Sequence, residues 1–184
     1  MERPADSHIE RFLDPILFGR GMAVLRIFFG AILLANGFAK ILERTRIDVG
    51  WYRGNLVGRA GAGNILDFEV NRRDDRGTLV PGLKDLVNDV ILPHWNIFEW
   101  VVTALETGVG ALLILGLASR LAALIGLSQM LFLAAVYFSS NRWMFEQPHE
   151  YVPLIILSLV PAGRIWGVDG DIIRRYPALR RWPF

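Results

Sequence analysis

Charged side chains lie inside otherwise apolar stretches of this 184-residue chain, and they are the residues that could do chemistry. The first stretch contains Arg26 and Lys40, and the second contains Glu99 and Glu106. Ionisable groups are costly inside a membrane, so each one needs a partner or a function. A buried carboxyl group can supply or accept a proton when a ligand reacts. Glu106 is therefore the candidate catalytic residue.

Helical spacing predicts that these side chains share a pocket. Arg26 and Lys40 lie on one helical face, and Glu99 and Glu106, seven residues apart, lie on another. With Gln129 from a third stretch, they could form a polar pocket for a quinone headgroup. By helical rise, Lys40 and Glu99 both lie within about 5 Å of one membrane boundary, which predicts that they pair or at least share a polar pocket. Glu106 lies about 13 Å deep, where Arg26 or Gln129 could reach it. The alternative is that these groups are structural ion pairs.

A second cluster is predicted from two histidines. His94 and His149 each precede an apolar stretch that begins on the same side, with Glu146 and Glu150 nearby. Two imidazoles with carboxylates could ligate a metal or contact a quinone, although histidine also populates the interfacial belt of membrane proteins. No histidine lies inside an apolar stretch and the chain has no cysteine, so no haem, flavin or iron–sulfur site is recognisable.

The elements that carry these residues are apolar helices. Hydrophobic residues make up 53% of the chain, and the apolar blocks lack the polar stripe of a soluble helix. Four spans are expected, at about 21–42, 97–117, 121–139 and 151–166. The prediction is an all-α, integral membrane four-helix bundle that forms a single domain over residues 1–184.

Local signals refine this bundle. Ala118 to Arg120 allow only a tight turn, which makes the second and third spans antiparallel neighbours. Pro153 and Pro161 predict a kink or an early break in the last span. Small residues at a spacing of four predict close helix packing; they are Ala31, Ala35, Ala39, Ala104, Gly108, Ala118, Ala122 and Gly126.

The stretch between the first two spans, about residues 43–96, is too charged to cross a membrane. We expect a long extracytoplasmic loop, with an amphipathic helix where apolar residues recur after Pro81. Arginines are concentrated in the turns and tail on the side of the termini, which favours a cytoplasmic location for both. The basic tail follows an apolar block, so its expected partner is the lipid bilayer and not nucleic acid.

The sequence also resembles a known family. Arg26, the run from Gly37 to Lys40, the stretch from Glu106 to Ala123 and the ending from Gly163 to Asp169 are similar to the DoxX/DoxD membrane proteins. Pro93, just ahead of the second span, is similar to the DoxD branch, which includes the small subunit of thiosulfate:quinone oxidoreductase. The resemblance implies a four-helix protein of a bacterial or archaeal inner membrane. It also implies that Arg26, Lys40, Glu106 and Arg120 are the important positions.

Two functions are expected from these observations. The first is a membrane subunit of a quinone-linked oxidoreductase, in which other membrane or soluble redox subunits bring the electrons. The second is a non-catalytic accessory subunit of a larger respiratory or photosynthetic complex. A transporter is disfavoured because the sequence has no discontinuous helix pair or inverted repeat.

Overall fold

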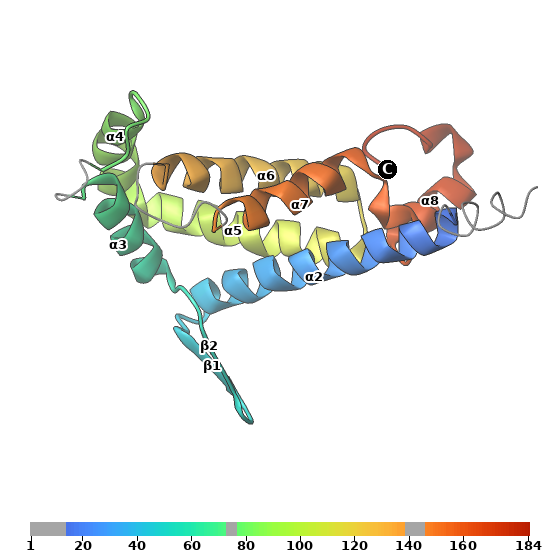
Figure 1. Ribbon diagram of the computed structural model, residues 1–184, viewed down its shortest axis with the longest axis horizontal. Helices are drawn as coiled ribbons and strands as arrows, with labels where there is room; N and C mark the ends of the chain where they lie inside the picture. The colour runs from blue at the N-terminus through green and yellow to red at the C-terminus, as the bar shows by residue number, and fades with distance from the viewer. Residues whose placement is uncertain (1–13, 73–76, 139–145) are drawn as a thin grey trace, which may run out of the picture.

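Within the part of the chain that the structure describes, three helices are long and apolar enough to cross a membrane: Pro15–Ile41, Leu83–Leu115 and Ser119–Val136. The computed structural model describes residues 14–72, 77–138 and 146–184 and is mostly helical (Figure 1). Helices α2 (Pro15–Ile41), α5 (Trp95–Leu115) and α6 (Ser119–Val136) run side by side with the shorter α7 (Pro148–Leu159). The expectation of a mostly helical membrane protein is confirmed, and three of the four expected spans correspond to the helices that are long enough to cross a membrane.

Helix α7 is the element that differs most from its expected span, 151–166. It has 12 residues, about 18 Å of helix, whereas a full crossing needs about 30 Å. Val160 is extended and Pro161 follows it, so the predicted early break is confirmed. The chain continues through η3 (Ala162–Arg164), α8 (Val168–Arg175) and η4 (Pro177–Leu179).

Helices α2 and α5 approach most closely at glycines. A Cβ atom on Gly110 would lie 2.5 Å from the backbone nitrogen of Leu34 and 2.8 Å from the carbonyl oxygen of Gly30. A Cβ atom on Gly37 would lie 2.7 Å from the backbone nitrogen of Thr107. The two backbones are therefore in contact at two levels, as small residues allow.

The small-residue prediction is only partly confirmed. Ala122 and Gly126 are buried in α6, as expected. Ala104 and Gly108, however, lie on the exposed side of α5. Gly110 occupies the face toward α2, and Val109 packs toward Gly126 of α6.

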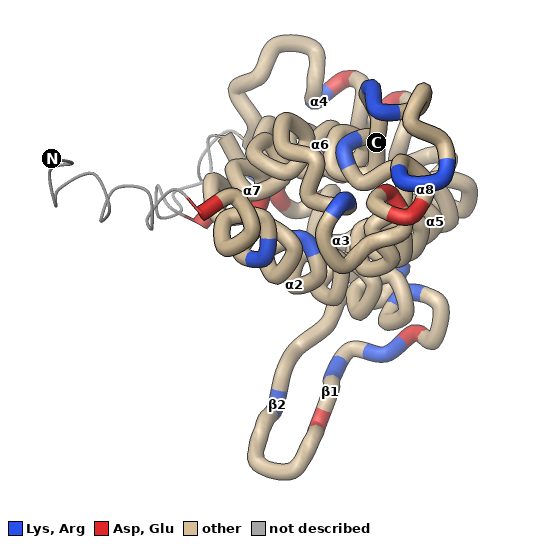
Figure 2. Tube along the Cα trace, turned by 90° about the vertical axis from the view of Figure 1, so that its right-hand side faces the viewer, with Lys and Arg blue, Asp and Glu red and all other residues tan. Residues whose placement is uncertain are grey.

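The stretch between α2 and α5 is a folded unit in its described part, which corrects the expected loop. It contains an antiparallel hairpin, β1 (Arg46–Val49) and β2 (Tyr52–Asn55), and then helix α3 (Arg59–Val70). The hairpin was not predicted, and it projects away from the bundle (Figures 1 and 2).

The expected amphipathic helix after Pro81 is present and runs directly into α5. It consists of α4 (Leu83–Asp85), η1 (Leu86–Ile91) and η2 (Leu92–His94). Leu83, Val87 and Ile91 are buried. Pro93 has no backbone N–H to donate, and the helix adopts π and 3₁₀ geometry just ahead of it and around it.

The core has two parts. The larger one lies between α2, α5, α6 and α7 and includes Leu33, Leu113, Ala122 and Leu154. The smaller one joins α3 and the helix at 83–91 to Val136 of α6. This second core holds the folded stretch against one end of the bundle, while the start of α2 and the C-terminal segment lie at the other end (Figure 1).

Candidate functional site

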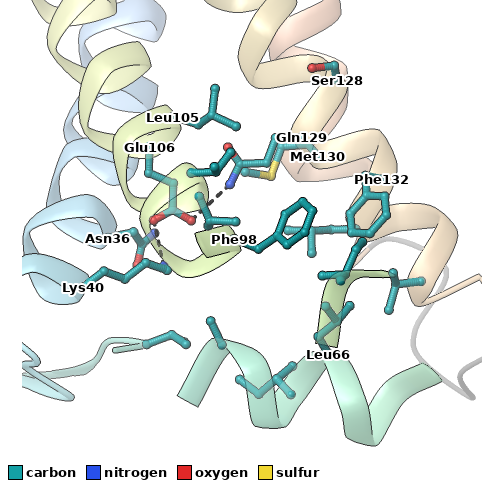
Figure 3. A pocket seen from close by; sticks show the side chains of 18 of the residues that line it. Asn36, Lys40, Leu66, Phe98, Leu105, Glu106, Ser128, Gln129, Met130 and Phe132 are labelled. Carbon is teal, nitrogen blue, oxygen red and sulfur yellow. Dashed lines mark hydrogen bonds and ion pairs between the residues drawn. The ribbon is translucent and has the colours of Figure 1, made fainter. Parts of the chain in front are cut away.

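A cavity of about 470 Å³ lies where α3 covers the ends of α2, α5 and α6 (Figure 3). Its size is within the range of small-molecule binding sites. Most of its walls are apolar, and its polar residues come from α2, α5, α6 and the first turn of α7. The polar lining residues are Asn36, Lys40, Glu106, Ser128, Gln129 and Glu150, and the apolar ones include Leu66, Phe98, Phe132 and Leu133.

The charged centre of this cavity is a buried ion pair. Lys40 Nζ donates a hydrogen bond of 2.7 Å to Glu106 Oε2, and both side chains are less than a tenth exposed. Gln129 Nε2 donates to the other carboxylate oxygen, Oε1, over 3.2 Å. Asn36 lies beside the pair (Figure 3). The structure therefore brings Lys40, Glu106 and Gln129 together.

The predicted pair of Lys40 with Glu99 is wrong. Glu99 does not line the cavity, and Lys40 bonds to Glu106. The prediction assumed that α2 and α5 end at the same level, but α5 extends beyond the end of α2 (Figure 1). The contact of Gly37 with Thr107 places Lys40 beside the turn that carries Glu106. Because helical side chains lean toward the N-terminus, the two side chains of these antiparallel helices converge.

Arg26 is not part of this site, contrary to the prediction. It is completely buried near the opposite end of the bundle. Its guanidinium donates to the carbonyl oxygens of Leu113 (2.6 Å) and Ile114 (3.3 Å) in the last turn of α5, and to that of Trp166 (2.8 Å). A cation at this position compensates the negative end of the α5 dipole. The role of Arg26 is thus structural.

Helix α3 closes the cavity from outside the bundle. Arg59 at its start bonds to Glu43 over 2.5 Å and lies 4.1 Å from the ring centre of Trp100 on α5. Gly63 rests on Trp95, where a Cβ atom would lie 2.7 Å from the indole Nε1. This cover was not predicted, and the helical spacing after Pro81 is the one sequence signal that pointed toward a folded element here.

Trp95, the first residue of α5, also lines the cavity. Its Nε1 atom is buried and has no acceptor among the described residues. Buried donors are normally hydrogen-bonded, so this one is available to a ligand atom. The signal that could have found it is its place at the start of an apolar helix beside a polar cluster.

The predicted histidine site gains no support within the described residues. No group of three histidine or acidic side chains there is arranged to hold a metal. His94 is exposed, and its Nδ1 is 2.9 Å from the carbonyl oxygen of Val90 on its own helix. His149 is also exposed. Glu150, expected in the same cluster, lines the cavity instead.

The end of the bundle opposite the cavity is held by Asp169. This fully buried carboxylate accepts hydrogen bonds from the backbone nitrogens of Ala118 (2.6 Å) and Ser119 (3.0 Å) and from the hydroxyl of Ser119 (2.8 Å). It caps the N-terminus of α6 from another part of the chain. Arg120 donates to the carbonyl oxygen of Ser158 over 3.1 Å, which ties α6 to α7.

Comparison with known protein families identifies the family of this chain. The DoxX family matches residues 21–139, which is more than half of the chain and includes Lys40, Glu106 and Gln129. No curated protein and no solved structure matches it. The chain therefore belongs to the DoxX family of membrane proteins.

Proposed function

We propose that this protein is the membrane subunit of a quinone-linked oxidoreductase and that the cavity under α3 holds the quinone. The observation that carries the proposal is the Lys40–Glu106 ion pair at one end of an otherwise apolar cavity. A quinone is likewise polar at one end and apolar at the other, because its ring carries polar oxygens and its tail is apolar. An accessory subunit that only packs against its neighbours needs no such cavity.

The residues present fit a quinone. Donors at Lys40, Gln129 and Trp95 could bond to its oxygens, while Phe98 and Phe132 offer apolar surface to the ring and tail. Bound quinone would supply two-electron, two-proton redox chemistry. The electron source is expected in a partner subunit, since the sequence has no recognisable flavin, haem or iron–sulfur site.

In this proposal Glu106 handles protons. Its carboxylate accepts from both Lys40 and Gln129, so the negative charge is held in place at the cavity wall. A carboxylate in that position can take up a proton or hand one to a ligand oxygen within hydrogen-bond reach. Lys40 would hold the positive charge that complements Glu106, and the pair favours a polar ligand group at this end.

The proposal includes a four-pass topology in a bacterial or archaeal inner membrane. Although α7 is short, its outward residues Val152, Ile155, Ile156 and Leu159 are apolar and exposed, as lipid contact requires. Both termini are assigned to the cytoplasm by the positive-inside rule. The end with α8 is rich in arginine, and the hairpin at the opposite end mixes basic with acidic residues (Figure 2).

The test is to purify the protein from native membranes in mild detergent and extract its quinone. Glu106→Gln and Trp95→Phe should each lower the bound quinone at least several-fold without loss of the folded protein. Glu99→Gln is the matched control, because Glu99 is on the same helix but does not line the cavity. Equal quinone content in the original protein and all three variants would exclude the cavity as its site.

One observation favours the second candidate function, an accessory subunit. The hairpin tip presents Trp51 (95% exposed), Tyr52 and Val49 away from the bundle, which is an unusual use of large side chains unless they contact something. A Trp51→Ser/Tyr52→Ser variant should lose its partner subunits during purification if the hairpin docks on them. Retention of quinone with loss of partners would support both functions together.

A further inference from the structure

A second concavity, of about 810 Å³, lies at the end of the bundle opposite the cavity, and its lining is basic. It is formed by the start of α2, the end of α5 and the segment from Arg164 to Arg180. Four arginines line it, and they are Arg20, Arg164, Arg174 and Arg180. Among the lining residues that the structure describes, Asp171 alone is acidic, so four positive charges and one negative charge sum to +3.

These arginines are poorly neutralised by the protein itself. Asp171 forms an ion pair with Arg174. Among the described residues, Arg20 and Arg180 have no carboxylate partner. Arg164 donates one nitrogen to the main-chain oxygen of Phe184 over 3.0 Å, and its buried Nε has no acceptor in the part of the chain that the structure describes. Positive charges outnumber negative ones around this concavity, and guanidinium groups in such an arrangement favour an anionic ligand.

Apolar residues in the same lining indicate what kind of anion fits. Ile16, Leu115 and Trp166 line the concavity and are each more than half exposed. Leu17 and Phe18 extend this exposed apolar surface along the first turn of α2. Basic residues that meet apolar surface at the end of membrane-spanning helices are placed at the level of lipid headgroups.

We infer that this concavity binds the phosphate group of an anionic phospholipid, with the arginines on the phosphate and an acyl chain along Ile16 and Leu115. A free phosphate ion offers the same charge to the arginines but has no use for the apolar lining. The inference does not rest on the proposed quinone site, which is at the other end of the bundle.

The test is a lipid titration of the purified protein in detergent, followed by native mass spectrometry. Phosphatidylglycerol should bind in preference to phosphatidylcholine. The variant Arg20→Gln/Arg180→Gln should bind phosphatidylglycerol about 25-fold more weakly, since each arginine near a lipid surface contributes about a five-fold gain in affinity. Arg20→Lys/Arg180→Lys should keep most of the affinity.

The matched control is Arg46→Gln/Arg53→Gln, which removes two exposed arginines from the hairpin at the opposite end. It should change the affinity less than two-fold. Equal weakening in both double variants would mean a general charge effect and would overturn the site. Displacement of the lipid by millimolar inorganic phosphate would overturn the assignment to a phospholipid. Unchanged melting temperatures of the variants without lipid would confirm that they are folded.

Discussion

Lys40 Nζ lies 2.7 Å from the carboxylate of Glu106, although the two residues are 66 positions apart and belong to different helices. The pair is buried at the end of an apolar cavity, where charges are costly unless they are compensated. Its position depends on the contact of Gly37 with Thr107, which fixes how far α5 extends past α2. Packing at glycines therefore positions the candidate functional site.

The first prediction concerns the energy of this pair. Lys40→Met should lower the free energy of unfolding by about 3–5 kcal/mol, because it leaves the Glu106 carboxylate buried without its cation. The double variant Lys40→Met/Glu106→Gln should recover a large part of that loss, since no lone charge then remains. Denaturant unfolding in detergent micelles measures both. Losses that simply add in the double variant would show that the two groups are not coupled.

A second prediction separates two glycines of one helix. Gly110→Ala should destabilise the protein by about 1–3 kcal/mol, because the new Cβ would meet the backbone of α2. Gly108→Ala is the control, since a Cβ atom there would meet nothing within 4 Å, and it should be neutral or stabilising by up to about 1 kcal/mol. Thermal unfolding compares the two, and similar melting temperatures would argue against the close crossing.

The third prediction tests the cap on α6. Asp169→Ala removes three hydrogen bonds to a buried carboxylate, so a loss of about 2–3 kcal/mol is expected. Asp171→Ala, two residues away and exposed, should cost less than about 1 kcal/mol because its ion pair with Arg174 is on the surface. The same unfolding assay applies. If the two substitutions cost the same, Asp169 does not have the capping role assigned to it.

The fourth prediction concerns orientation. The chain contains no cysteine, so a single introduced cysteine can be labelled without background. The test uses cells whose inner membrane is intact and whose outer layers have been made permeable. In them, a thiol reagent that cannot cross the inner membrane should label Trp51→Cys but not Arg175→Cys. Disruption of the inner membrane should make both reactive. The reverse pattern would place the termini on the extracytoplasmic side.

Sequence patterns predicted the elements that depend on short-range properties. The apolar blocks located α2, α5 and α6, because a run of apolar residues long enough for the bilayer is itself the signal. The tight turn before Ser119 and the early end of α7 followed from residues within a few positions of each. The shared face from Arg26 to Lys40 was also correct, since helical periodicity alone determines it.

Contacts between segments that are far apart in the chain could not be predicted from such short-range patterns. Lys40 was assigned to Glu99 because depth was counted from each helix end, and only the packing at Gly37 and Gly110 showed that the ends are not level. The role of Arg26 at the carbonyl groups of α5 and the cover formed by α3 have the same origin. The sequence by itself determined where the long apolar helices lie and which of their faces carry the polar residues. The tertiary structure decided which charges meet, because the relative depth of two helices depends on close contacts between residues far apart in the chain.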